Sequence, residues 1–370
     1  MQLANLRNYE SLRLPIPGEL VVLTGPNGAG KTNFLEALSL LTPGRGLRRA
    51  AFEEITRIDA DGGWAVSASI RRNGEDARIG TGFRRNEAGE GSARTTRING
   101  AAKSSPEAML EYLRVLWLTP AMDGLFTGPA GDRRRFLDRL VLAVYPGHGR
   151  SVRDFERLGT QRNRLLEENR AAAWLDAVEA QLAERAVALA LARSETVTLL
   201  SARIAAGAER NAGFPAGRIA LSSEFDAALA GRSAAQAEIW YRDVLAASRA
   251  ADRAAGRALQ GPNRSDLLVR FAEKDMPAAL SSTGEQKALL IGLILAHAEL
   301  VSAVSGMTPV LLLDEIVAHL DPGRRAALFA RLAALGCQTF MTGTDPGLFA
   351  DLPGDAARFE VAGGRVAMVT

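Results

Sequence analysis

The sequence predicts an α/β protein in which a helical lobe interrupts a head built from both ends of the chain. Residues 19–23 and 310–313 are continuous apolar runs, typical of strands buried on both faces, and each run ends in a motif with chemical groups. Residues 167–210 predict the lobe, because they are almost unbroken helix by propensity. The two strands lie on either side of this helix in the sequence, so the head must be discontinuous.

Composition narrows the classes of protein that fit. The chain has 370 residues, which is enough for two domains with their own cores. A single cysteine, Cys337, excludes an internal disulfide framework, and three scattered histidines argue against a histidine-rich metal centre. Residues 1–10 lack an apolar signal core, and the longest apolar run, residues 288–300, is too short and too polar to span a bilayer. We therefore expect a cytoplasmic protein without a membrane segment.

The N-terminal half of the head is predicted to contain a strand, a helix and a small antiparallel sheet. The strand at residues 19–23 is followed, after a glycine-rich loop, by helical apolar spacing over residues 32–41. Residues 64–70 and 78–83 have strand composition, and a turn signal at residues 73–74 separates them. These segments predict hairpins with arginines on or near their exposed ends.

The central part of the chain predicts a helical lobe. The helix at residues 167–210 has an apolar stripe of mixed three- and four-residue spacing, and residues 213–215 end it. A second helical stretch covers residues 236–259. Two antiparallel helices, a short coiled-coil-like arm, account for this pattern. We expect the domains to be residues 1–120 for the first half of the head, 121–260 for the helical lobe and 261–370 for the second half of the head.

A phosphate-binding loop follows the first strand. Residues 25–32 fit the P-loop pattern G-x-x-x-x-G-K-[ST], in which glycines let backbone N–H groups point at phosphate oxygens. The next helix presents its positive end to the same anion, Lys31 reaches the β- and γ-phosphates, and Thr32 places a hydroxyl on Mg²⁺. The predicted ATP-binding residues of this loop are Gly25, Pro26, Asn27, Gly28, Ala29, Gly30, Lys31 and Thr32.

The second apolar strand ends in Asp314-Glu315, which is a Walker B pattern. Asp314 is predicted to hold Mg²⁺ together with Thr32, and Glu315 to polarise the attacking water as general base. Glu315 and Lys31 are therefore the predicted catalytic residues. A buried strand ending in acidic helix-capping residues explains the pattern equally well by itself, and the phosphate loop elsewhere in the chain favours the catalytic interpretation. A helix over 324–335 and a strand over 338–342 continue the α/β pattern.

A third motif lies between the phosphate loop and the Walker B strand. Ser282-Thr283-Gly284-Glu285 directly precedes a long apolar helix, and this order resembles the signature motif of ABC-type ATPases. In that class, Ser282 and Gly284 contact the γ-phosphate of a nucleotide held by a second subunit. The resemblance predicts an ABC-type P-loop ATPase head and an ATP-dependent homodimer. A capping box of Ser282 and Glu285 explains the same residues structurally, and both interpretations can hold together.

Three further features bear on turnover. Residues 319–322 resemble the D-loop of the same superfamily, which places Asp321 at the dimer interface, although a plain Asp-Pro helix start fits equally well. ABC enzymes usually carry a histidine after the strand that follows Walker B, where this chain has Thr342 and Thr344. No glutamine lies between Lys31 and Gln161, so the usual Q-loop glutamine is absent. Both departures favour a slow switch over a motor and argue against the competing prediction, the nucleotide-binding subunit of an ABC transporter.

Motifs along nearly the whole chain resemble the RecF family of bacterial DNA replication and repair proteins, which are SMC/Rad50-like ABC ATPases. The motifs lie at residues 6–9, 25–37, 45–48, 128–138, 261–267, 282–287 and 311–322. The resemblance implies ATP-dependent dimerisation, slow hydrolysis and DNA binding. It also implies a role in recombinational repair at gaps, with RecR as partner and RecA loading as the outcome.

Arginines are the candidate DNA contacts, because guanidinium groups bind phosphates irrespective of base sequence. Arginine supplies 41 of the 45 basic residues in a chain of net charge +3, although GC-rich coding explains any single arginine equally well. No aromatic residues interleave with them to stack unpaired bases, so double-stranded, gapped or junction DNA is favoured. The candidates are Arg45, Arg48, Arg49, Arg71, Arg72, Arg84, Arg85, Arg94, Arg97, Arg133, Arg134 and Arg135.

Overall fold

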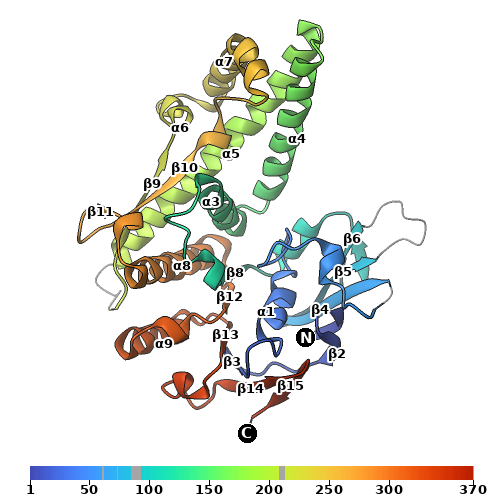
Figure 1. Cartoon of the computed structure of the whole chain (residues 1–370), viewed down its shortest axis with the longest axis vertical. Coiled ribbons are helices and arrows are strands. Elements are labelled where there is room, and N and C mark those ends of the chain that lie inside the picture. The colour runs from blue at the N-terminus through green and yellow to red at the C-terminus, as the bar shows by residue number, and fades with distance from the viewer. Residues whose placement is uncertain (61, 73, 85–92, 208–212, 370) are drawn as a thin grey trace. The chain divides into compact units, whose positions relative to one another are not determined.

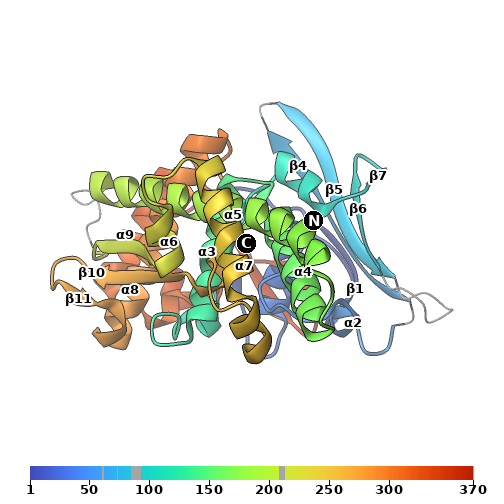
Figure 2. The same cartoon turned by 90° about the horizontal axis from the view of Figure 1, so that it is seen from above.

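The computed structural model describes residues 1–60, 62–72, 74–84, 93–207 and 213–369. The chain forms two compact units, which we call the head unit and the arm unit. The head unit contains the described residues of Met1–Asp123, Glu209–Pro215 and Ser282–Thr370, and the arm unit those of Gly124–Ala208 and Ala216–Ser281. Figures 1 and 2 show the elements of both units from two directions.

A six-stranded sheet forms the centre of the head unit, with strand order β15-β14-β3-β13-β12-β8. All neighbouring strands are parallel except β14 and β15. The strands predicted at residues 19–23, 310–313 and 338–342 are all confirmed, and burial on both faces explains why the first two are apolar runs. The strands are β3 (Leu20–Thr24), β8 (Val115–Leu118), β12 (Val310–Leu313), β13 (Thr339–Gly343), β14 (Ala357–Ala362) and β15 (Arg365–Met368).

A second sheet of the head unit is antiparallel, with strand order β2-β1-β4-β5-β6-β7. The predicted hairpin is confirmed, because β4 and β5 pair from Gly63 with Arg84 to Arg72 with Glu75. Trp64, Val66 and Ile79 are buried on the inner face. The strands are β1 (Gln2–Leu6), β2 (Tyr9–Arg13), β4 (Gly63–Arg72), β5 (Glu75–Arg84), β6 (Ala93–Ile98) and β7 (Ala101–Lys103).

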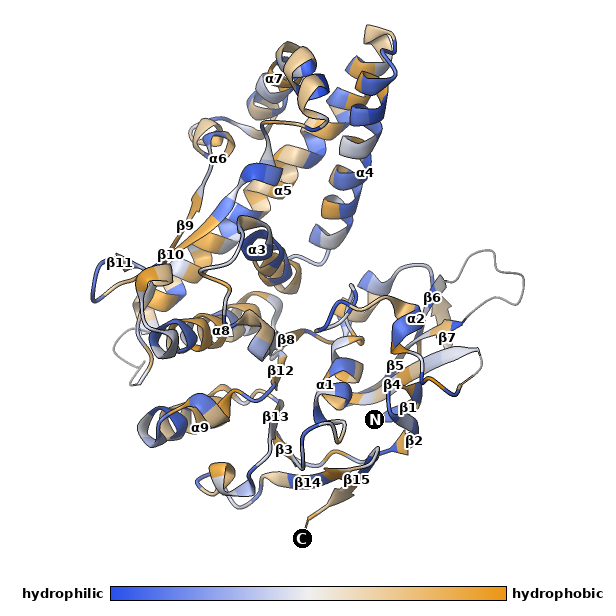
Figure 3. Ribbon diagram, viewed as in Figure 1, coloured by the Kyte–Doolittle hydropathy of each residue, from blue (hydrophilic) through white to orange (hydrophobic). Residues whose placement is uncertain are grey.

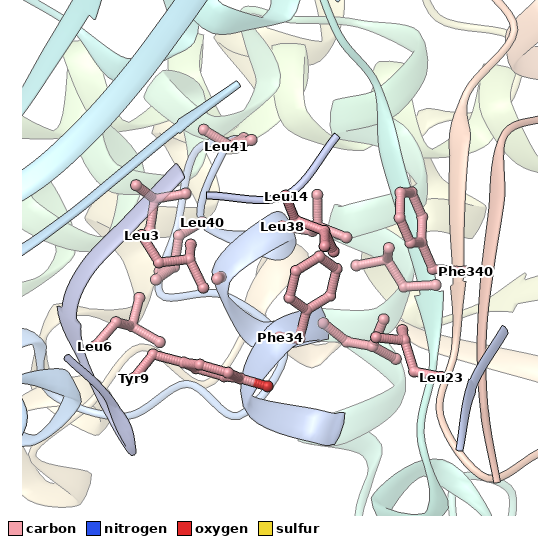
Figure 4. Close-up of a cluster of buried hydrophobic side chains, with 14 of the residues drawn as sticks. Leu3, Leu6, Tyr9, Leu14, Leu23, Phe34, Leu38, Leu40, Leu41 and Phe340 are labelled. Atoms are coloured by element: carbon pink, nitrogen blue, oxygen red, sulfur yellow. The ribbon is translucent and has the colours of Figure 1, made fainter. Parts of the chain in front are cut away.

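Helix α1 (Lys31–Ser39) lies between these two sheets. Figure 4 shows Phe34 of α1 between Leu6 of the antiparallel sheet and Phe340 of the parallel sheet. One continuous apolar core therefore holds α1 from both sides and fixes the position of its first turn. That turn carries the end of the phosphate loop.

Two longer helices, α8 (Thr283–Ser305) and α9 (Pro322–Leu335), cover the other face of the parallel sheet (Figure 1). The predicted helix at residues 324–335 is confirmed as part of α9. Among the described helices, only α8 is long and apolar enough to cross a membrane, and 72% of its most apolar window is buried inside the protein. The remaining helices of this unit are α2 (Phe52–Ile55) and the 3₁₀ segments η1 (Pro106–Glu111), η2 (Pro120–Met122), η6 (Val317–His319) and η7 (Pro346–Phe349).

The arm unit contains three long helices that pack together, where the sequence predicted two. The predicted helix at residues 167–210 begins later, because Asn169 has a φ of +53°, a left-handed conformation that ends the preceding helix. Residues 208–210, its predicted end, lie outside the described residues. In Figure 3 polar and apolar residues alternate along α4, which leaves one face of that helix hydrophilic. The helices are α3 (Ala130–Val144), α4 (His148–Glu167), α5 (Ala172–Gly207), α6 (Glu224–Leu229) and α7 (Ala234–Ala255).

A small antiparallel sheet completes the arm unit. Strand β10 (Asp266–Phe271) pairs with β9 (Gly217–Ser222) along its whole length and with β11 (Met276–Pro277). Short 3₁₀ segments, η4 (Pro262–Arg264) and η5 (Ala278–Leu280), flank these strands. Because of this pairing, residues 261–281 group with the arm unit, whereas the sequence assigned them to the head.

A buried arginine joins the three long helices. The side chain of Arg162 on α4 is fully buried and donates to Glu179 Oε1 on α5 at 2.8 Å. It also donates to Asp252 Oδ2 and to the Leu245 carbonyl oxygen on α7, both at 2.7 Å. All three guanidinium nitrogens are therefore hydrogen-bonded inside the unit.

Candidate nucleotide-binding site

The phosphate loop connects the end of β3 to α1 and has the backbone that anion binding requires. Gly25, Gly28 and Gly30 all have positive φ angles, of 147°, 79° and 119°. A Cβ at Gly25 would lie 2.2 Å from the carbonyl oxygen of Val361 on β14, so only glycine fits there. A Cβ at Gly30 would lie 2.5 Å from Asn8 Nδ2, and at Gly28 the positive φ alone favours glycine.

Lys31 is buried at the start of α1, and its ammonium group is hydrogen-bonded only to neutral groups. Its Nζ donates to the carbonyl oxygens of Gly25 at 2.7 Å and Pro26 at 3.0 Å. Burial lowers the pKa of Lys31, while the negative charges of Glu315 and Asp314 act in the opposite direction. Among the residues that the structure describes, Lys31 has no ion-pair partner, so an anion that enters the loop supplies the missing countercharge.

Two residues at the turn between β1 and β2 donate hydrogen bonds to the phosphate loop. Asn8 Nδ2 donates to the Ala29 carbonyl oxygen at 2.9 Å, and the Tyr9 hydroxyl donates to that of Gly30 at 3.0 Å. Burial raises the pKa of Tyr9, so its hydroxyl stays protonated and keeps donating. The sequence analysis placed both residues in a family motif, residues 6–9, but nothing in that motif indicates a contact with the loop.

A buried carboxylate holds the helix that follows the loop. Glu36 is fully buried and accepts two hydrogen bonds from Arg7, at 2.8 and 2.9 Å, and one from Arg48 at 3.2 Å. Arg48 also donates to Asn33 Oδ1 at 2.5 Å. These bonds tie α1 to the N-terminal turn and to the loop that follows α1.

The ends of β12 and β13 bring the Walker B residues to the phosphate loop. Asp314 Oδ1 accepts from the Thr32 hydroxyl at 3.0 Å and from the Thr342 hydroxyl at 2.8 Å. Burial raises the pKa of Asp314, and these two hydroxyls partly oppose the rise. The backbone of Glu315 is left-handed, with φ +54°, and its N–H donates to Thr342 Oγ1 at 2.9 Å. The predicted pair Thr32 and Asp314 thus meets, although the two residues are 282 positions apart.

The donors at this point fit Mg²⁺. A hydroxyl and a carboxylate are hard oxygen ligands, and Mg²⁺ in nucleotide sites typically takes one or two such ligands plus phosphate oxygens. Asp314 and Thr32 are the residues that would hold the ion. It would neutralise charge on the phosphates when bound.

Ser282 caps α8 at an exposed position. Its hydroxyl accepts from the Glu285 N–H at 3.4 Å, and Glu285 Oε2 accepts from the Ser282 N–H at 3.0 Å. The predicted capping box is confirmed. A Cβ at Gly284 would meet no atom of the chain within 4 Å, so internal packing does not explain a glycine in this first helical turn. Gly284 leaves the helix start open to an approaching molecule.

Two other motif residues have local partners. Asp321 caps α9, because its Oδ1 accepts from the Arg324 N–H at 2.9 Å. This supports the helix-start interpretation. Asp321 is also exposed, and its interface role stays a prediction. At the position of the usual histidine, Thr342 is fully buried and Thr344 is exposed. Thr342 therefore bonds to the Walker B residues.

Several arginines that the sequence offered as DNA contacts hold the fold instead. Arg94 donates to the carbonyl oxygens of Leu40, Thr42 and Gly44, and burial lowers its pKa to about 10. Arg48 is bonded to Glu36, as described above. These arginines compensate backbone carbonyls and buried carboxylates that would otherwise lack partners.

The arginines of residues 133–135 serve the arm unit. Arg133 forms a two-pronged ion pair with Asp266 of β10, at 2.7 and 2.8 Å, and Arg134 donates to the Ser265 carbonyl oxygen. Arg135 pairs with Asp132. This segment therefore fixes α3 against the small sheet.

The other candidates are at the surface of the head unit. Arg71 pairs with Asp76, and Arg72 donates to the Gly306 carbonyl oxygen. Arg85 lies outside the described residues. The exposed candidates that remain are Arg45, Arg49, Arg84 and Arg97.

An arginine stripe on α4 was missed by sequence reasoning. Arg150, Arg153, Arg157 and Arg164 are exposed and follow each other at three-, four- and seven-residue intervals, so they share one face of the helix. The side chains of Arg150, Arg157 and Arg164 are 82%, 63% and 77% exposed. Arg150 and Arg157 both lie near Asp154, at 3.7 and 3.8 Å, and Arg164 pairs with Glu168 at 2.7 Å; such exposed ion pairs are weak, so a phosphate can replace the carboxylate. Helical spacing of the arginines was the signal that could have revealed this stripe.

Comparison with known proteins decides the family. Residues 1–357 match the model of the RecF/RecN/SMC N terminal domain. A relative from Mesorhizobium japonicum, named DNA replication and repair protein RecF, is 54% identical over 367 residues, which cover 99% of this chain and 96% of the relative. A relative of the same name from Allorhizobium ampelinum is 55% identical over 360 residues, covering 97% and 95%. The chain belongs to the RecF family.

The fold agrees with membership in the RecF family. A solved structure described as the recombination mediator protein RecF-ATPrS in the RecFOR pathway has a TM-score of 0.86 over 100% of this chain and 97% of its own, at 22% identity. The predicted α/β class, an SMC-like ABC-type ATPase head with an inserted helical lobe, is confirmed. A transporter subunit, the competing prediction, is not favoured by these matches.

Proposed function

We propose that this chain is an ATP-dependent DNA-binding repair protein that dimerises when ATP is bound. One observation carries the proposal: a RecF-family chain brings its phosphate loop and Walker B carboxylate together and leaves its signature helix start exposed. Relatives more than 50% identical are named for DNA replication and repair. The related solved structure is described as RecF-ATPrS, which supports ATP as the nucleotide.

The phosphate loop holds the nucleotide in this proposal. Backbone N–H groups of residues 27–32, at the end of the loop and the N-terminus of α1, face the phosphates, and Lys31 exchanges its two carbonyl partners for phosphate oxygens. Thr32 and Asp314 hold Mg²⁺. Glu315, on its left-handed backbone, orients and deprotonates the attacking water.

A second protomer completes the site. Ser282 and the exposed turn at Gly284 approach the γ-phosphate held by the partner's loop, because the free N–H groups of a helix start bind anions. The dimer therefore persists while the γ-phosphate is present. Slow hydrolysis then acts as a release switch.

The arginine stripe of α4 is the DNA-facing surface that we favour. Four exposed guanidinium groups on one helix face suit a phosphate backbone and carry no base specificity. Double-stranded, gapped or junction DNA presents such a backbone continuously. Through this binding the protein supports RecA loading in recombinational repair, with RecR as partner, in line with the RecFOR pathway named for its structural relative.

A gel-shift experiment tests the function. Duplex, gapped and single-stranded DNA are each titrated with protein in the presence of ATP, ADP or no nucleotide. We expect ATP to tighten binding to duplex and gapped DNA, with an affinity that falls steeply with salt, and we expect Lys31→Ala to abolish the ATP effect. DNA binding that is equal in all three nucleotide states, or absent in all three, would contradict the proposal.

A paired variant tests the surface. Arg150→Gln/Arg157→Gln should weaken duplex binding and reduce its salt dependence by about two phosphate contacts. Arg218→Gln/Arg270→Gln removes two exposed arginines of the arm unit's sheet, which are 60% and 44% exposed; it is the matched control and should bind like the wild type. Equal loss in both variants would reduce the stripe to a general charge effect.

A further inference from the structure

One hydroxyl contacts both predicted Walker B residues. Thr342 lies at the end of β13 with its side chain fully buried. Its Oγ1 donates to Asp314 Oδ1 at 2.8 Å and accepts from the Glu315 N–H at 2.9 Å. A hydroxyl has one proton and two lone pairs, so both bonds form at the same time.

The same strand provides a contrasting threonine. Thr339 is also fully buried, but its hydroxyl donates to the carbonyl oxygen of Cys337 two residues away, at 2.9 Å. A local backbone carbonyl is thus enough to satisfy a buried threonine on β13. Thr342 therefore does not need long-range hydrogen bonds to satisfy its hydroxyl. Its two bonds nevertheless go to Asp314 and Glu315, the predicted Walker B residues.

The two bonds act on different properties. The Asp314 carboxylate is buried, and burial without hydrogen-bond donors disfavours its charged form. Of its two hydroxyl donors, Thr32 belongs to the phosphate loop, whereas Thr342 belongs to the neighbouring strand and has no contact with the loop's anion in the proposed function. At Glu315, the bond to the N–H holds a left-handed backbone that glutamate rarely adopts.

We propose that Thr342 is a positioning residue for the nucleotide site. It holds the Asp314 carboxylate toward Thr32 and fixes the backbone on which Glu315 stands, so that a single side chain aligns the metal-holding and water-activating groups. The proposal rests on the proposed function and adds a residue outside the loop, Walker B and signature motifs. The single proton of the hydroxyl is already donated to Asp314, so in this role Thr342 orients the Walker B residues and does not donate to the γ-phosphate.

Calorimetric binding of ATPγS, once with Mg²⁺ and once with EDTA, tests this role. The readout is the affinity for ATPγS with Mg²⁺ divided by the affinity with EDTA. This ratio is measured in the wild type and in Thr342→Val, Thr342→Ser and Thr339→Val. Partners that orient metal ligands typically change metal affinity 10–100-fold when they are replaced, so Thr342→Val should lower the ratio by about that factor. Thr342→Ser, which keeps the hydroxyl, should retain the wild-type ratio. Thr339→Val should also retain it.

Each outcome separates the alternatives. Binding in EDTA should be unchanged in Thr342→Val, because the phosphate loop is intact. An unchanged ratio in Thr342→Val, or an equal fall in Thr339→Val, would overturn the positioning role. A fall of the ratio in Thr342→Ser would also overturn the positioning role, because this variant keeps the hydroxyl and loses only the methyl group. This outcome is informative even if Thr342→Val does not fold. A wild type with no Mg²⁺ dependence would instead overturn the proposed metal site.

Discussion

Each unit contains a cluster of buried charge, and the two clusters differ in their partners. In the arm unit, Arg162 is surrounded by Glu179, Asp252 and a backbone carbonyl, and every guanidinium nitrogen is bonded. In the head unit, Lys31 and Asp314 are buried too, but each is bonded only to neutral carbonyls or hydroxyls. Neither has an ion-pair partner among the described residues.

This difference shows how to separate a structural charge from a functional one. A buried charge without a countercharge is destabilising unless something compensates it. Three backbone carbonyls do this for Arg94, whereas at the Walker motifs we expect a ligand to do so. A fully paired charge needs no ligand and specifies packing. Burial is common to both units, and the state of the partners distinguishes them.

The largest expected effect comes from breaking the arm's cluster. Arg162→Ala removes the ion-pair partner of the buried Asp252 and leaves Glu179 with Arg249 alone, so it should lower the free energy of unfolding by about 3–5 kcal/mol. Urea unfolding followed by circular dichroism measures this change. Arg170→Ala, which removes an exposed partner of Glu168, is the control and should change stability by about 0–1 kcal/mol. Similar losses in both variants would contradict the role of Arg162.

Removing the charge of Lys31 should leave the stability of the nucleotide-free protein intact and abolish its stabilisation by nucleotide. Lys31→Met keeps the aliphatic stem and removes a buried ammonium whose pKa burial already lowers. We expect the melting temperature of the nucleotide-free protein to stay the same or to rise. The stabilisation that saturating ATPγS gives the wild type, about 2.7 kcal/mol at one hundred times Kd, should disappear. A Lys31→Met protein that melts well below the wild type without nucleotide would place Lys31 with the structural charges.

The smallest effect concerns a buried group that lies outside both clusters. Burial raises the pKa of the Cys337 thiol to about 12, so the reactive thiolate is scarce at neutral pH. The native protein should therefore react with DTNB far more slowly than the unfolded protein, with and without ATPγS. Protection that appears only when nucleotide is added would contradict this expectation.

Sequence reasoning predicted the parts of the site that are contiguous. The loop of residues 25–32 and the Asp314-Glu315 pair each follow an apolar strand, and the local sequence pattern alone predicts their chemistry. Thr32 and Asp314 meet in the structure because the carboxyl ends of parallel strands share one edge of a sheet. These are the cases in which a short segment carries both the element and the function.

The missed residues act through tertiary contacts. Tyr9 reaches the loop from a strand whose neighbours no local pattern records. The sequence indicated Thr342 at the position of the usual histidine, but not its bonds to Asp314 and Glu315. The segment around Arg94 has the composition of an exposed hairpin, yet Arg94 donates to the carbonyl oxygens of Leu40 and Thr42, more than fifty residues away. In the arm, β9 was missed because a six-residue strand between helices resembles a loop, and only its pairing with β10 reveals it.

Closure of two heads on ATP underlies the whole proposed mechanism, and sedimentation velocity of Glu315→Gln is its sharpest test. This variant keeps the loop and removes the general base, so with ATP and Mg²⁺ it should sediment as a dimer, and without nucleotide as a monomer. Gly284→Arg in the same background fills the open turn before α8 and should remain monomeric while still binding ATPγS. A Glu315→Gln protein that stays monomeric with ATP, or a Gly284→Arg protein that dimerises as well as its parent, would contradict ATP-dependent closure.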